Sequence, residues 1–239
     1  MRRPRAAPAL LVAFAALATA HLGALLAGSA VATATKPALM PLLAAYALAR
    51  GGPPPLAAAL LLGCGGDTLL QVGGDTAFLL GMGSFAAGHV CYLLLCARHG
   101  TAGGRRTYGL AALYAAGWLA TMTLLWPGLE ADLRVPVTLY SLLLTAMALG
   151  VSRAGVRAGA GGLLFLVSDT LIAGGLAGLP RPPVPQFWIM LTYLAAQFLL
   201  ADGLLRSGRT TRGAGPRRPG PPRTAGRQSW TASRASTMP

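Results

Sequence analysis

Residues 55–72 read PLAAALLLGCGGDTLLQV, an apolar stretch that holds one charged residue, Asp67. About 20 apolar residues in a helix are enough to cross the hydrocarbon core of a bilayer. Comparable stretches lie on both sides of it, separated by clusters of Gly, Pro and Arg. The predicted spans are 8–28, 31–49, 55–72, 76–97, 107–126, 135–151, 158–178 and 185–205. The sequence therefore predicts an all-α, polytopic integral membrane protein with about eight transmembrane helices.

The composition agrees with a membrane protein. Hydrophobic residues make up 54% of the chain and charged residues 11%, whereas a soluble domain carries about 25% charged residues. Cys64, Cys91 and Cys96 lie inside apolar stretches without a CxxC spacing. Neither a disulfide framework nor a zinc site is predicted.

The basic residues are distributed unevenly among the gaps between the spans. One set of alternate gaps holds Arg2, Arg3, Arg5, Arg50, Arg98, Arg105, Arg106, Arg153, Arg157 and the basic residues from Arg206 onward. The other set holds Arg134 and Arg181, with the acids Asp75, Glu130 and Asp132. Because cytoplasmic loops carry an excess of Lys and Arg, both termini are expected in the cytoplasm. This distribution accounts for the net charge of +14 without a nucleic-acid partner.

The two ends of the chain differ from the spans. Residues 1–206 are predicted to form the eight-helix membrane domain, and residues 207–239 a basic, disordered cytoplasmic tail. The tail is expected either to lie against anionic membrane lipids or to be merely solvated. The arginines before the first apolar stretch are compatible with a signal peptide, but the stretch continues to Ala27, so an uncleaved first helix is expected. The preference for Arg over Lys favours a bacterial plasma membrane.

Two acids lie well inside predicted spans. Counted from Leu56 and Arg157, Asp67 and Asp169 are roughly 16 and 18 Å deep at about 1.5 Å per residue. An ionised carboxylate in a spanning helix is costly, so it normally faces the protein interior or a wet cavity. Residues 67–70 (DTLL) resemble residues 169–172 (DTLI), which predicts a possible four-plus-four parallel repeat. We expect the two aspartates to face a common cavity.

Other polar residues fall at compatible depths. The candidates for shaping the cavity are Lys36, His89, Tyr92, Tyr140, Ser168, Tyr193 and Gln197. Each also has a structural interpretation: Lys36 as the neutralising partner of one aspartate, His89 as a hydrogen-bonded core residue, and Tyr193 with Gln197 as an interhelical bonding pair. The glycines at 63, 65 and 66 match no phosphate-binding loop and indicate close helix packing.

These residues occur in short motifs with a recognisable order. They are TKP at 35–37, GGDTLL at 65–70, FAAGHVCY at 85–92, GGLLFLVSD at 161–169 and TYLAAQ at 192–197. Together they resemble the YhhN-like membrane proteins, which include the lysoplasmalogenases. The resemblance implies eight helices and hydrolysis of the vinyl ether bond of a lysoplasmalogen to a fatty aldehyde and glycerophospho-ethanolamine or -choline. It also implies that Asp67 and Asp169 are the catalytic pair.

The chemistry agrees with that implication. Vinyl ether hydrolysis requires a proton on carbon, which creates an oxocarbenium-like centre that water then attacks. One protonated and one ionised aspartate suffice, as in the paired carboxylates of glycosidases, so no metal or other cofactor is expected. Two alternatives remain from the residues alone: a proton-coupled transporter, which also carries buried acids near the midplane, and a non-catalytic lipid-binding protein.

Overall fold

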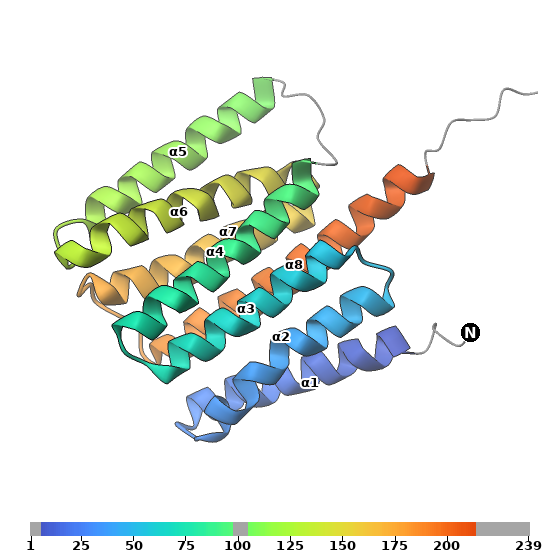
Figure 1. Cartoon of the computed structure of the whole chain (residues 1–239), viewed down its shortest axis with the longest axis horizontal. Coiled ribbons are helices and arrows are strands. Elements are labelled where there is room, and N and C mark those ends of the chain that lie inside the picture. Colours follow the sequence, from blue (N-terminus) through green and yellow to red (C-terminus); the bar gives the residue numbers. More distant parts are fainter. Residues whose placement is uncertain (1–5, 98–104, 214–239) are drawn as a thin grey trace, which may run out of the picture.

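The computed structural model describes residues 6–97 and 105–213. Its elements are α1 (Ala6–Leu26), α2 (Val31–Ala49), α3 (Pro54–Val72), α4 (Asp75–Ala97), α5 (Arg105–Leu125), α6 (Ala131–Ser152), α7 (Val156–Leu176) and α8 (Pro185–Gly213) (Figure 1). Each helix is long and apolar enough to cross a membrane. The predicted all-α, eight-span architecture is confirmed over the described residues.

Two helix ends differ by more than two residues from the sequence expectation. Helix α6 begins at Ala131 rather than 135, because Asp132 falls in its first turn, where the helix dipole favours an acidic side chain. Helix α8 continues past residue 206 to Gly213. Its Arg206 donates to Asp202 one turn earlier, at 2.7 Å, which ties the extension to the span. Most of the predicted tail, residues 214–239, lies outside the described residues.

The helices pack in the same sequential order in both halves of the chain. Helices α1 to α4 contact one another in succession, and α5 to α8 do likewise. Between the halves, α4 packs against α6, and α8 packs against both α1 and α2 (Figure 1). The α4–α6 and α2–α8 contacts are equivalent if α1–α4 corresponds to α5–α8, with α3 matching α7, whereas the α1–α8 contact has no comparable counterpart between α4 and α5. A parallel duplication would give this arrangement, although the repeat itself stays a prediction.

The surface of the bundle is apolar where lipid replaces water. Leu113, Leu124 and Leu139 are each more than 60% exposed, while Tyr92 and Phe165 are buried near the centre. Lipid chains are as apolar as leucine, so helix association in a membrane depends on close packing rather than on removing leucine from water. The small residues at the helix contacts therefore decide how the bundle assembles.

Gly161 and Gly162 bring α7 against its neighbours. A Cβ atom on Gly161 would lie 2.8 Å from the Leu200 backbone nitrogen of α8 and 2.9 Å from the Ala196 carbonyl oxygen. On Gly162 it would lie 2.9 Å from the Ala148 Cα atom of α6. Because these neighbours are backbone atoms, they cannot move aside without shifting a helix.

We predict that Gly161→Ala lowers the free energy of unfolding by about 1–3 kcal/mol, the usual cost of overpacking. The matched control is Gly83→Ala in α4, where an added Cβ meets no atom within 4 Å. The control should unfold at the wild-type temperature or slightly above it, since Ala favours a helix over Gly. Thermal unfolding in detergent would measure both, and equal melting temperatures for the two variants would contradict the packing role of Gly161.

Candidate active site

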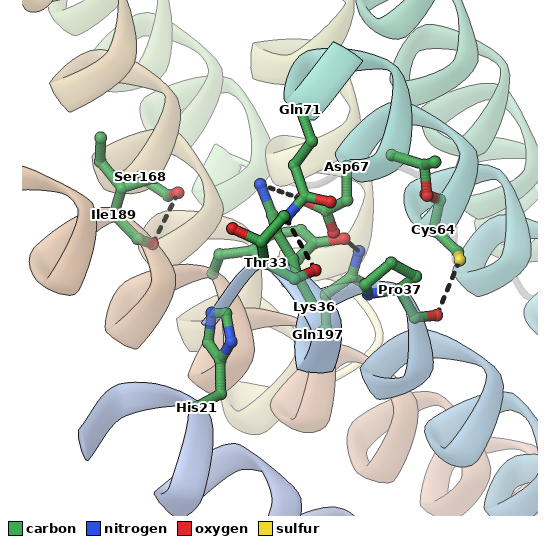
Figure 2. A network of polar contacts seen from close by, with 12 residues as sticks. His21, Thr33, Lys36, Pro37, Cys64, Asp67, Gln71, Ser168, Ile189 and Gln197 are labelled. Atoms are coloured by element: carbon green, nitrogen blue, oxygen red, sulfur yellow. Dashed lines mark hydrogen bonds and ion pairs between the residues drawn. The ribbon is translucent and has the colours of Figure 1, made fainter. Parts of the chain in front are cut away.

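Two prolines in α2 fix the position of this helix against α3. Pro37 and Pro41 lack the N–H groups that would bond the carbonyls one turn earlier. Those carbonyls instead accept side-chain donors from α3: Gln71 Nε2 lies 3.4 Å from the Thr33 oxygen, and Cys64 Sγ lies 3.1 Å from the Pro37 oxygen. Figure 2 shows both contacts near the Lys36 side chain. The prolines thus hold the lysine of α2 opposite α3.

Lys36 forms an ion pair with Asp67. Its Nζ atom lies 3.2 Å from Asp67 Oδ1 (Figure 2), and the two side chains are 14% and 6% exposed. In a medium of low dielectric constant, an ionised carboxylate persists only with a close counter-charge or several donors. The pair therefore gives an ionised Asp67 the counter-charge that it needs inside the bundle.

A chain of hydrogen bonds supports Asp67 from behind. The buried Tyr92 hydroxyl of α4 donates to Gln197 Oε1 of α8 at 2.6 Å. Gln197 Nε2 donates to the Tyr193 hydroxyl at 3.3 Å, and Tyr193 lies close enough to the Asp67 carboxylate to interact with it. Every donor in this chain is directed toward the aspartate. The chain orients the carboxylate and leaves its negative charge paired with Lys36.

Asp169 has a different environment. The Tyr140 hydroxyl of α6 donates to Asp169 Oδ2, and His89 Nε2 of α4 lies 3.2 Å from the same hydroxyl. Because that hydroxyl donates to Asp169, it accepts from His89, whose Nε2 then carries the proton. No salt bridge links Asp169 to a Lys, Arg or His within the described residues. Asp169 therefore has neutral partners where Asp67 has a cation.

Both aspartates line one polar cavity of about 420 Å³. Its other polar lining residues come from the halves of the helices that are remote from the two chain termini. They are His21, Thr33, Lys36, Gln71, Ser168, Gln186 and Tyr193. The two carboxyl groups are close enough to interact electrostatically. The common cavity expected from the sequence is present.

A second cavity, of about 360 Å³, is almost entirely apolar. It lies among α4, α5, α6 and α7, and its wall includes Met82, Leu113, Trp118, Met122, Leu144 and Leu166. Asp169 and Phe85 line both cavities, so they mark the junction of the polar and the apolar space. A single-chain amphiphile has the same division between a polar head and an apolar chain.

The predicted site residues divide into two groups. Asp67, Asp169, Lys36, Tyr140, Ser168 and Tyr193 line one or both cavities. His89, Tyr92 and Gln197 are buried and reach the cavities only through Tyr140 and Tyr193. The sequence reasoning missed His21 and Gln71, which are polar residues near the ends of spans. Their depth, close to that of Lys36, was the available signal.

The glycines beside Asp67 serve close packing, as the sequence indicates. A Cβ atom on Gly66 would lie 2.5 Å from the Phe85 ring, and one on Gly63 would lie 2.8 Å from the Tyr193 hydroxyl oxygen. Phe85 also packs edge-to-face on Tyr193, with ring centroids 6.0 Å apart. The glycines let these two aromatic side chains approach the aspartate.

Comparison with known proteins identifies the class. The YhhN family model matches residues 31–204, so the chain belongs to the YhhN family. It is 33% identical over 148 residues to a lysoplasmalogenase of Mycobacterium tuberculosis, covering 58% of this chain and 55% of the relative. It is 33% identical over 133 residues to the human lysoplasmalogenase TMEM86B, covering 52% of each. The chain spans about half the length of the curated relatives it matches. No solved structure matches it significantly.

We predict that Lys36→Met destabilises the protein by about 3 kcal/mol, because it leaves the Asp67 charge buried without its counter-ion. Combining it with Asp67→Asn should restore most of that stability. The control is Arg206→Met, because the Arg206 side chain is 57% exposed and the buried Asp202 keeps its second partner, Arg157, at 2.7 Å. The loss should therefore be about 1 kcal/mol or less. Unfolding in detergent would measure all three. If the double variant is no more stable than Lys36→Met alone, the ion pair does not explain the stability.

Proposed function

We propose that this protein is an intramembrane hydrolase that cleaves the vinyl ether bond of a lysoplasmalogen. The products are a fatty aldehyde and glycerophospho-ethanolamine or -choline. The observation that carries the proposal is the position of Asp169 at the junction of an apolar and a polar cavity. A lysoplasmalogen bound with its chain in the apolar cavity and its headgroup in the polar cavity has its vinyl ether bond at that junction. The names of the similar proteins support the same substrate class.

The two aspartates suit different steps. Asp169, with a neutral donor at Oδ2 and no salt bridge to a cation in the described chain, is the proposed acid. Its proton is transferred to the vinyl carbon remote from the ether oxygen, which leaves an oxocarbenium ion. Asp67, kept ionised by Lys36, stabilises that cation and takes a proton from the attacking water. The resulting hemiacetal then breaks its C–O bond. The proton held by Asp67 passes to the glycerol oxygen, the hydroxyl proton of the hemiacetal returns to Asp169, and the aldehyde is released.

The polar cavity also supports an orientation. Its lining residues lie at the start of α2, the end of α3 and the start of α8. These ends are opposite the termini of the described chain, Ala6 and Gly213 (Figure 1). With both termini in the cytoplasm, as the distribution of arginines favours, the headgroup is taken from the outer leaflet of a bacterial plasma membrane.

The first test is aldehyde release from lysoplasmenyl-ethanolamine by detergent-solubilised protein. Asp67→Asn and Asp169→Asn should each lower kcat by a factor of about 10² to 10⁴, since each removes a proton-transfer group. Asp75→Asn is the control, because Asp75 is an exposed residue in the first turn of α4, and it should keep wild-type activity. No membrane gradient is needed for a hydrolase, whereas a proton-coupled carrier would show uptake that requires one. Wild-type protein without activity above a mock preparation would overturn the proposal.

The apolar cavity predicts chain-length selectivity. Gly117 of α5 lines this cavity, and an added Cβ there meets no atom within 4 Å. Gly117→Phe should therefore fill the cavity without moving the backbone. It should lower kcat/KM for a long alkenyl chain at least tenfold more than for a short one, because a filled pocket excludes methylene groups worth about 0.8 kcal/mol each.

The matched variant for this selectivity is Gly109→Phe, on the same helix but at an exposed position outside the cavity. It should leave the ratio of kcat/KM values for the two chain lengths unchanged. Equal chain-length ratios for Gly117→Phe and Gly109→Phe would mean that the substrate chain binds elsewhere.

A further inference from the structure

His21 belongs to the polar cavity although it lies outside the family-matched region. The YhhN family model begins at residue 31, whereas His21 is near the end of α1. Its ring is 1% exposed and forms part of the wall that also holds Lys36 and Asp67. Figure 2 shows the ring projecting from α1 toward the polar network. The proposed acid–base chemistry does not use it.

The hydrogen bonds of His21 determine what it offers to a ligand. Its Nδ1 atom lies 2.9 Å from Thr35 Oγ1. Thr35 directs its own hydroxyl hydrogen to the Val31 carbonyl, at 2.8 Å, so toward His21 it can only accept. His21 Nδ1 therefore carries the proton, and in a neutral imidazole Nε2 is then a lone-pair acceptor. Nε2 is buried without a hydrogen-bond partner in the described chain.

A buried acceptor without a partner is costly, so a ligand that supplies a donor there gains affinity. The substrate class of the proposed function has two kinds of donor at its polar end: the sn-2 hydroxyl of the glycerol and the ammonium of ethanolamine. The phosphodiester, when ionised, has only acceptors, and choline has no N–H group. Lys36, a cation with three donors, is the counterpart for the phosphate.

We propose that His21 is a specificity residue whose Nε2 accepts a hydrogen bond from a donor at the polar end of the substrate. This inference rests on the proposed function for its substrate class. It assigns α1 to headgroup recognition and leaves the chemistry to Asp67 and Asp169. A ligand without a donor at its polar end gains nothing from His21.

The test measures binding of four non-hydrolysable lipids in which a 1-O-alkyl ether replaces the vinyl ether. They combine a hydroxyl or a hydrogen at sn-2 with an ethanolamine or a choline headgroup. Wild-type full-length protein in detergent should bind the sn-2-deoxy choline lipid at least about fivefold more weakly than one of the donor-bearing lipids, the effect of one hydrogen bond. If wild-type protein binds all four equally, the proposal is overturned.

The variants assign the effect to His21. His21→Leu removes the acceptor and should abolish the difference among the lipids, whereas His21→Gln keeps an acceptor oxygen and should retain part of it. Thr19→Val is the control on the same helix, because Thr19 is exposed and does not line the cavity. If His21→Leu no longer distinguishes the sn-2-hydroxyl lipids from the sn-2-deoxy lipids, the hydroxyl is the donor. If it no longer distinguishes ethanolamine from choline lipids, the ammonium is the donor. An equal loss of affinity for all four lipids in His21→Leu would show a structural role and overturn the proposal.

These outcomes are separable from those of the aldehyde assay. Binding of alkyl ether lipids requires no turnover, so His21-dependent selectivity in a protein that releases no aldehyde would leave this inference standing and remove the hydrolase. Aldehyde release with equal binding of the four lipids would do the opposite.

Discussion

The structure depends on holding a carboxylate inside a bundle surrounded by lipid. An unpaired charge at that depth would cost more free energy than a helix contact returns. Asp67 therefore requires Lys36 at 3.2 Å. Lys36 in turn depends on two prolines, since Pro37 and Pro41 release the carbonyls by which Gln71 and Cys64 of α3 hold α2 in place. Gly63 and Gly66 have no side chains, so Tyr193 and Phe85 can pack against α3 beside Asp67.

Asp67 and Asp169 are both buried aspartates, but the hydrogen-bonded side chains around them give the two carboxyl groups different environments. The chain through Gln197 and Tyr193 ends on an aspartate that already has a cation. The chain through His89 and Tyr140 ends on Asp169, which has only neutral partners in the described structure. Because each chain is buried and directional, neither carboxyl group reorients freely. Such preorganised dipoles avoid reorganisation at the moment of reaction, so the difference between the acids is built into the fold before a substrate binds.

The fold could be predicted from the sequence because the bilayer fixes the length of each span and makes buried acids conspicuous. Asp67, Asp169 and Lys36 followed from that scarcity. The apolar cavity could not be predicted, since the leucines that line it look the same in sequence as those that face lipid. His89 was expected at the cavity but lies behind Tyr140, because depth along a helix does not give the direction of a side chain. His21 lies at a depth close to that of Lys36 but was not among the expected residues, since depth alone does not show that its side chain turns toward the cavity.

Helix α1 occupies a separate place in the bundle. It packs mainly on α2 and α8, while both aspartates lie on helices within the family-matched region. One wall of the polar cavity is thus supplied by an element that carries none of the acids. With His21 in the proposed recognition role, substitutions in that wall would change ligand choice and leave the helices that hold the acids in place. Selection on lipid preference and selection on the proposed chemistry would then act on different segments of the chain, so that one could change without the other.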